Sequence, residues 1–249
     1  MRELFIDCST GLSGDMLSAA LLELCPDREN MLKRLNSFGI PGIEYSAGTV
    51  KSYSGAGTHL TVRYLGKEEG ANSPDEYHHG GHINDIFAVI DGLGMQDKVR
   101  ENVKGIYRLL ADAESKVHGC NVENIHFHEL GTMDAVADIS SACFLIAELG
   151  AEHITASPVR TGYGTVECAH GVMPVPAPAT ALLLKGLPSF AGDVEGELCT
   201  PTGAAIVKYF ANAFGQAPLM TTEAMGYGIG NKDFGRLSCV RASLGKTDI

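Results

Sequence analysis

Residues 4–25 read LFIDCSTGLSGDMLSAALLELC, and this stretch decides the fold. Its first five residues form a short apolar run, which is typical of a buried strand. Glycines follow at positions 11 and 14, and residues 16–25 are almost wholly apolar up to Pro26, which predicts a buried helix. A strand, a glycine turn and a helix in this order indicate a domain that mixes α and β structure.

The chain outside this stretch continues the same pattern. Periodic apolar residues predict helices over residues 27–39, 83–90, 95–118, 132–150, 178–185 and 200–215. Strands are expected near residues 4–8, 43–50, 57–65, 153–159 and 237–244. We therefore expect an α/β or α+β fold, in which a mixed sheet is flanked by helices, as one domain over residues 1–249. The order of the strands cannot be read from the sequence.

Composition and charge narrow the class of protein. The 249 residues carry a net charge of −11, which favours attraction of cations over binding to nucleic acids or anionic membranes. The 7 cysteines are scattered and form no CxxC pair, which indicates reduced thiols in a cytoplasm. We see no signal peptide, and the apolar runs are too short to span a bilayer. A cytoplasmic protein is expected.

The turn before the first helix is one candidate anion site. Backbone amides and the helix dipole near Ser13 and Gly14 would favour a phosphate. The spacing matches neither a Walker A nor a GxGxxG pattern, and Ser13 can equally be a helix cap. Asp7 and Asp15, which flank this turn, could instead hold a cation at the carboxyl end of the strand.

A second helix start, at residues 200–203, reads Thr-Pro-Thr-Gly. A cap at Thr200 and proline at the first helical position explain this sequence locally. The hydroxyls of Thr200 and Thr202 at a helix N-terminus also fit a phosphate. We prefer this site for a phosphate, because Asp15 would repel one at the first helix.

Metal-binding side chains gather in residues 125–138, which read IHFHELGTMDAVAD. His126 and His128 are two apart, so a strand would point both imidazoles to one side. Asp134 and Asp138 are four apart, so a helix would place both carboxylates on one face. Such a mixture suits Ni, Zn, Fe or Mn better than Ca or Mg. The alternative is that Asp134 complements the helix dipole and the others are ordinary surface or hydrogen-bonding residues.

Two further groups could bind a metal. His78, His79 and His82 lie in a glycine-rich loop, which is either a histidine-bearing lid or a solvated polar loop. Cys168 and His170 are two apart, so an extended segment would turn a thiolate and an imidazole to the same side. A small buried thiol is the common alternative for Cys168.

Several segments together resemble the LarC family of nickel insertion proteins. The matching pieces are DCSTGLSGDM at 7–16, HFHELG at 126–131 with Asp134 and Asp138, GYG at 162–164, CAHG at 168–171, PVPAPAT at 174–180 and TPTGA at 200–204. They follow the family's order, and the resemblance covers essentially the whole chain. The histidine-rich region of the family is often longer than His78, His79 and His82.

The resemblance implies a specific reaction. It implies CTP-dependent insertion of nickel into pyridinium-3,5-bisthiocarboxylic acid mononucleotide, which makes the nickel-pincer cofactor of lactate racemase. The enzyme would be a chelatase or cyclometallase-type lyase with Asp7, Asp15 and Glu129 as catalytic residues. The mononucleotide would be bound by Ser13, Gly14, Gly162, Gly164, Thr200 and Thr202.

The resemblance also implies partners. The family has a C-terminal domain associated with CTP and Mg or Mn, and we expect that domain to lie outside this chain. The expected partners are that domain, or a chain that carries it, and the phosphorylated, sulfur-bearing substrate. A homo-oligomer is left open.

Two other function classes stay open. A metal-dependent hydrolase would use Asp134 or Glu129 as the base and the metal to activate water. A non-catalytic module would only bind metal, or present a surface to a second chain that holds CTP.

Overall fold

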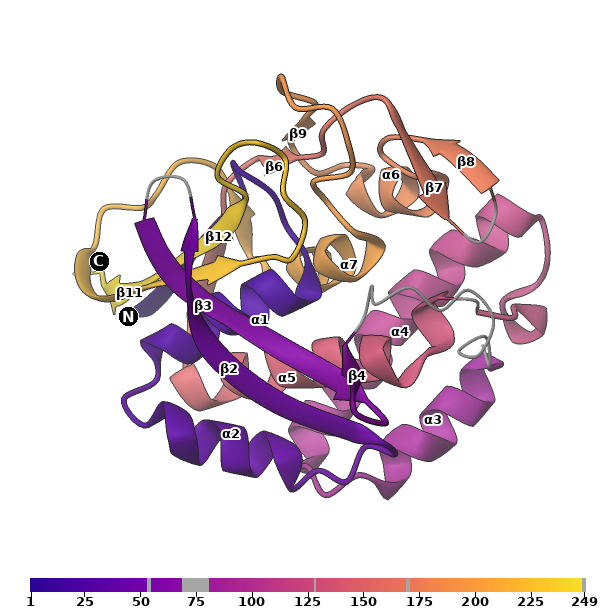
Figure 1. Cartoon of the computed structure of the whole chain (residues 1–249), viewed down its shortest axis with the longest axis horizontal. Coiled ribbons are helices and arrows are strands. Elements are labelled where there is room, and N and C mark those ends of the chain that lie inside the picture. The colour runs from indigo at the N-terminus through magenta and orange to yellow at the C-terminus, as the bar shows by residue number, and fades with distance from the viewer. Residues whose placement is uncertain (53–54, 69–80, 128, 169–170, 248–249) are drawn as a thin grey trace.

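The computed structural model describes residues 1–52, 55–68, 81–127, 129–168 and 171–247 (Figure 1). The strands are β1 (Arg2–Asp7), β2 (Ile43–Ser52), β3 (Gly55–Tyr64), β4 (Lys67–Glu68), β5 (His153–Ala156), β6 (Val159–Arg160), β7 (Thr165–Cys168), β8 (Gly171–Pro174), β9 (Ser189–Phe190), β10 (Ala213–Phe214), β11 (Thr221–Ile229) and β12 (Cys239–Lys246). The α-helices are α1 (Gly14–Leu24), α2 (Arg28–Asn36), α3 (Ile83–Gly92), α4 (Asp97–His118), α5 (Met133–Leu149), α6 (Pro178–Leu184) and α7 (Pro201–Phe210). Two 3-10 helices, η1 (Val122–Asn124) and η2 (Glu129–Gly131), lie between α4 and α5.

A mixed sheet of eight strands organises the fold, as Figure 1 shows. Its order is β10-β5-β1-β12-β11-β3-β2, and β4 pairs with β3. Strand β1 lies inside the sheet, where it runs parallel to β5 and antiparallel to β12. Two small sheets, β6-β9 and β7-β8, lie outside it. The expected mixed sheet flanked by helices is confirmed.

Helix α1 lies directly on the sheet, and two glycines of β11 allow this approach. A Cβ on Gly228 would lie 1.7 Å from the backbone oxygen of Met16, and one on Gly226 would lie 2.2 Å from that of Ala20. Any larger residue would therefore push the helix away. Helix α5 packs on α1 and α4 packs on α5, so the helices build layers outward from the sheet.

The predicted elements are largely confirmed, with two corrections. The strand expected near residues 153–159 breaks into β5 and β6, because Pro158 cannot donate a ladder hydrogen bond and β6 pairs with β9 instead. The helix expected over residues 200–215 ends at Phe210, and Ala213–Phe214 joins the sheet beside β5. Strand β11 was not predicted.

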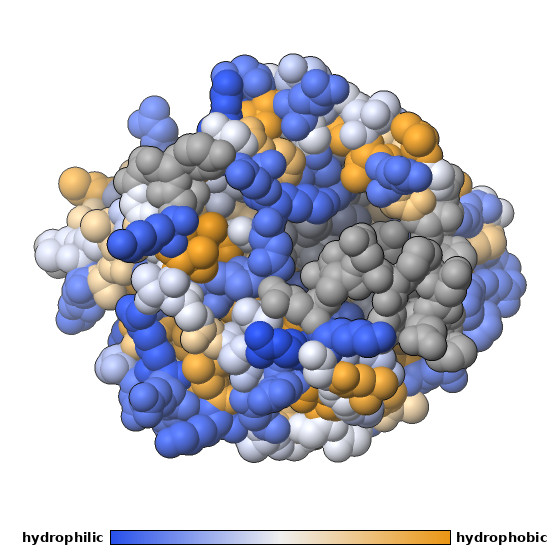
Figure 2. All heavy atoms as spheres, in the orientation of Figure 1, coloured by the Kyte–Doolittle hydropathy of each residue, from blue (hydrophilic) through white to orange (hydrophobic). Residues whose placement is uncertain are grey.

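In Figure 2 hydrophilic residues are spread over the coloured part of the face shown, with hydrophobic residues in separate groups among them. In the part of the chain that the structure describes, no helix is both long and apolar enough to be a membrane span. All seven cysteines are described, and each is a free thiol.

Candidate functional site

Four helices begin at one cavity of about 510 Å³. The residues that precede α1, α5, α6 and α7 all line it: Ser13, Thr132, Ala177 and Thr200. Each helix start carries partial positive charge and unsatisfied backbone N–H groups. The cavity is therefore suited to an anionic ligand.

The starts of α1 and α7 are held together by backbone contacts. The amide of Leu12 donates to Leu198 at 2.7 Å, and the amide of Thr200 donates back to Leu12 at 3.0 Å. Gly203 makes room for this, because a Cβ there would lie 2.8 Å from the Leu12 backbone oxygen. These contacts place the two helix starts that the sequence singled out, Ser13 and Thr200, on the same cavity.

The start of α1 also packs closely on α5, at the second turn of that helix. A Cβ on Gly14 would lie 2.9 Å from Cβ of Asp138, and one turn further Ser18 and Ser141 share a hydrogen bond of 2.8 Å. As a result Asp15 of α1 and Asp138 of α5 line the same cavity, although they are far apart in the sequence.

The cavity wall is rich in carboxylates. The acidic residues that line it are Asp15, Glu114, Asp138, Glu167 and Glu197. Asp15 accepts a hydrogen bond from the Ser13 hydroxyl, and Lys232 forms an ion pair with Glu197 at 3.8 Å. Several carboxylates around one cavity attract a metal cation.

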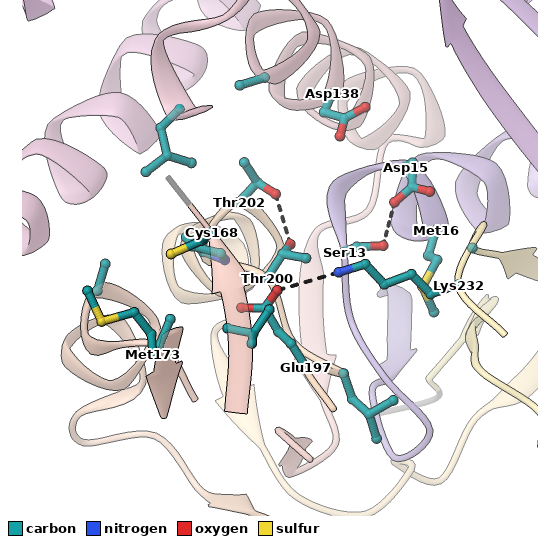
Figure 3. Close-up of a pocket in the computed structure, with 18 of the residues that line it drawn as sticks. Ser13, Asp15, Met16, Asp138, Cys168, Met173, Glu197, Thr200, Thr202 and Lys232 are labelled. Carbon is teal, nitrogen blue, oxygen red and sulfur yellow. Dashed lines mark hydrogen bonds and ion pairs between the residues drawn. The ribbon is translucent and has the colours of Figure 1, made fainter. Parts of the chain in front are cut away.

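Sulfur atoms are also present at the cavity. In the β7–β8 hairpin Val166 pairs with Met173 and Cys168 with Gly171, and both Cys168 and Met173 line the cavity. In Figure 3 these two side chains lie opposite Asp15 and Asp138. Thiol and thioether sulfur are ligands for soft and borderline metals, whereas carboxylates suit harder ones. The combination fits a borderline ion such as nickel.

Asp7 lies elsewhere and has a structural partner. Its carboxylate accepts hydrogen bonds from the Ser9 amide at 3.0 Å and from Arg241 at 2.6 Å. Burial alone would raise the pKa of Asp7, but these hydrogen bonds and the Arg241 charge outweigh it and hold that pKa below its usual value. Asp7 is not among the described residues that line the cavity.

Gly162 and Gly164 also have structural explanations. Both have positive φ, at 79° and 92°. A Cβ on Gly162 would lie 1.9 Å from the Gly196 backbone oxygen, and one on Gly164 would lie 3.1 Å from Cγ of Glu195. The described cavity lining includes neither glycine, so the geometry supplies no link between them and a bound nucleotide.

Of the histidines predicted as metal ligands, His82 and His126 lie close to each other. His82 and His126 form an isolated bridge, and their ring centroids lie 5.4 Å apart. His126 lies between the 3-10 helices η1 and η2, and the bridge to His82 pairs its segment with residue 82 in the manner of a strand. Nδ1 of His82 lies 3.0 Å from the backbone oxygen of Ile125.

Several predicted metal ligands lie outside the described residues: His78, His79, His128 and His170. The side chain of Glu129 is likewise outside the description. Among the residues that the structure does describe, no three or more His, Cys, Asp or Glu side chains form a ready-made metal site.

Asp134 is on α5 as predicted, one turn before Asp138, but it does not belong to the described cavity lining. Its Oδ1 is buried without a hydrogen-bond partner among the described residues. Burial raises the pKa of Asp134 to about 6. This carboxylate is therefore easier to protonate than an exposed one.

Several residues that line the cavity belong to no recognisable sequence motif. Glu114 lies on the amphipathic helix α4 among many other charged residues, and Glu197 and Lys232 lie in connecting segments without a motif. Met16 falls in the apolar run of residues 16–25, and methionine is common in cores, so neither it nor Met173 stands out as a site residue. Only the fold brings these residues together.

Comparison with known proteins gives the family. The family model described as "Nickel insertion protein" matches residues 4–249. The chain belongs to this family. No solved structure matches the chain.

Individual members of the nickel insertion family are similar in sequence to this chain over nearly its whole length. A Staphylococcus epidermidis protein named pyridinium-3,5-bisthiocarboxylic acid mononucleotide nickel insertion protein is 38% identical over 94% of this chain and 56% of its own length. A Desulfitobacterium hafniense protein of the same name is 39% identical over 99% of this chain and 59% of its own length. A Geotalea daltonii protein, provisionally named as a nickel insertion protein, is 41% identical over 99% of this chain and 62% of its own length. The chain thus spans about three fifths of the relatives that it matches.

Proposed function

We propose that this chain takes part in inserting nickel into pyridinium-3,5-bisthiocarboxylic acid mononucleotide, and that the cavity is where the two meet. The observation that carries the proposal is the convergence of four helix starts on a cavity that also presents Asp15, Asp138 and Cys168. Helix starts suit the anionic substrate, and carboxylate and sulfur atoms suit the nickel cargo.

The substrate's phosphate is assigned to the start of α7. The hydroxyls of Thr200 and Thr202 lie 2.9 Å apart there, and Thr200 also caps the Gly203 amide at 3.2 Å. Asp15 makes the start of α1 less suitable, because a carboxylate repels a phosphate. In this arrangement Ser13 and Gly14 position Asp15 and Asp138 rather than bind the phosphate.

Nickel is assigned to the carboxylate side of the cavity, near Asp15 and Asp138, with the Cys168 sulfur on the facing wall (Figure 3). The two thiocarboxylate sulfurs of the substrate are themselves good nickel ligands, so the protein has to supply only part of the coordination. A partial protein shell also allows the ion to leave with the product. Asp15 or Asp138 is proposed as the base for any proton that nickel insertion releases.

The reaction type, the use of CTP and the roles of several residues are also part of this proposal. We assign the lyase-type chemistry to the complete protein, with CTP and Mg or Mn bound by a C-terminal domain. The catalytic role of Glu129 and the ligand roles of His78, His79, His128 and His170 are retained as proposals.

Equilibrium binding measurements test the phosphate site and the nickel site separately. Thr200→Ala with Thr202→Ala should weaken binding of the mononucleotide by about tenfold or more and leave nickel affinity unchanged. Asp15→Asn with Asp138→Asn should do the reverse. Asp27→Ala, which removes the N-cap of α2 away from the cavity, controls for general loss of helix stability. If neither pair of substitutions changes either affinity, the cavity is not the site. Turnover of the mononucleotide without nickel transfer would favour a hydrolase.

A further inference from the structure

The cavity poses an electrostatic problem for the substrate of the proposed function. Five carboxylates line it, whereas the mononucleotide brings a phosphate and two thiocarboxylates, which are also anionic. Among the described lining residues, Lys232 is the single lysine or arginine. A cation at the position where the phosphate enters would offset the repulsion.

Lys232 is placed for this task. Its Nζ lies 3.8 Å from Oε2 of Glu197, which is longer than a hydrogen bond. The Lys232 side chain is 63% exposed, whereas that of Glu197 is 11% exposed. Figure 3 shows the lysine reaching toward Glu197 beside Thr200. The ammonium group can therefore exchange this loose partner for an incoming anion.

The segment that carries Lys232 is fixed to the rest of the fold. Arg236 donates to Asp193 at 2.6 Å, and Asp193 also pairs with Arg160. Phe234 packs on Gly196, where a Cβ would lie 2.8 Å from the ring. These contacts hold the backbone that directly follows the lysine, so that less ordering is needed when a ligand binds.

We infer that Lys232 binds the phosphate of the mononucleotide together with the hydroxyls of Thr200 and Thr202, and so makes the cavity selective for a phosphorylated ligand. This inference rests on the proposed function. Lysine suits the role because its ammonium is a compact point charge that donates to phosphate oxygens from several directions. Lys232 acts as a binding residue and takes no part in the chemistry at nickel.

The test compares two ligands, the mononucleotide and the nucleoside that lacks its phosphate. Lys232→Met should weaken binding of the mononucleotide by about 10- to 100-fold and change binding of the nucleoside by less than about twofold. Lys232→Arg should retain most of the affinity. The loss should shrink as salt is added, because exposed charges are screened.

A matched control is Lys246→Met. Lys246 is similarly exposed, at 64%, and similarly paired with a carboxylate, Glu223, but it lies outside the described cavity lining. Lys246→Met should leave the affinities for the mononucleotide and for the nucleoside unchanged. Circular dichroism of each variant verifies that the fold is intact.

The possible outcomes separate the inference from the function on which it rests. If the unaltered chain binds the mononucleotide and Lys232→Met binds it equally well, the inference is wrong and the proposed function stands. An equal loss for mononucleotide and nucleoside would assign Lys232 to a thiocarboxylate and overturn the phosphate assignment. If the unaltered chain binds neither ligand, the proposed function itself fails.

Discussion

The backbone of Gly14 faces the side chain of Asp138 so closely that a methyl group on Gly14 would lie 2.9 Å from Cβ and 3.0 Å from Oδ2 of that aspartate. This contact joins two sequence motifs that are more than a hundred residues apart. It explains why the first helix starts with glycine, and it brings Asp15 and Asp138 to one cavity.

Substitution of Gly14 by alanine tests this contact. The added methyl group should force α1 and α5 apart and lower the free energy of unfolding by about 1–2 kcal/mol, because overpacking is destabilising. Nickel affinity should fall as well, since the two carboxylates separate. Gly92→Ala is the control: it is also in a helix, and nothing lies within 4 Å of its added Cβ. If both variants unfold at the same denaturant concentration, the close contact is not present in solution.

Asp7 is expected to stabilise the fold without touching the substrate. The pKa of Asp7 in the folded protein lies below its ordinary value of 3.8. The stabilisation by this carboxylate is therefore complete above pH 3.8 and is lost as the pH falls through the pKa of the folded state. Asp7→Asn should therefore lower the free energy of unfolding by about 1–3 kcal/mol at pH 7 and by progressively less below pH 3.8. Denaturant titrations at several pH values measure this.

The exposed Asp97 supplies the control for Asp7. Its side chain is 96% exposed, and Asp97→Asn should change stability little at any pH. The affinities for nickel and mononucleotide should be unchanged in Asp7→Asn. If Asp7→Asn kept its stability but lost affinity for nickel or for the mononucleotide, Asp7 would again be a candidate catalytic residue.

Thiol reactivity should report on ligand binding at the cavity. Cys120 is exposed and Cys168 is half-buried at the cavity, whereas burial raises the pKa of Cys8, Cys143 and Cys199. Iodoacetamide should therefore modify Cys120 and Cys168 first, as read by mass spectrometry of peptides. Mononucleotide at ten times its Kd should slow modification of Cys168 by about tenfold and leave Cys120 unaffected. Equal protection of both thiols, or of neither, would place the ligand elsewhere.

The strands and helices with clear periodicity could be predicted from the sequence. Each strand that was missed has its own physical reason. Strand β11 was missed because Gly226 and Gly228 lower its β propensity, yet both are needed where α1 lies on the strand. The sheet continues through Ala213–Phe214 because β5 offers an edge there, which a helical pattern cannot reveal.

Many residues of the candidate site could be predicted from sequence motifs, but their arrangement around one cavity could not. Ser13, Asp15, Asp138, Cys168, Thr200 and Thr202 were singled out from the sequence, and all line the cavity. Lys232 and Glu197 carry no local signal, since a single charged residue in a connecting segment is usually only solvated. Gly162 and Gly164 were proposed as nucleotide-binding residues, whereas their visible role is backbone geometry.

The most direct test of the central claim is anomalous scattering at the nickel edge from crystals of the chain grown with nickel and the mononucleotide. The account predicts a nickel peak inside the cavity, within about 2.5 Å of an oxygen of Asp15 or Asp138 or of the sulfur of Cys168. The phosphate should lie by Thr200, Thr202 and Lys232 in the same map. A nickel peak at His82 and His126 alone, with the cavity free of metal and mononucleotide, would contradict it.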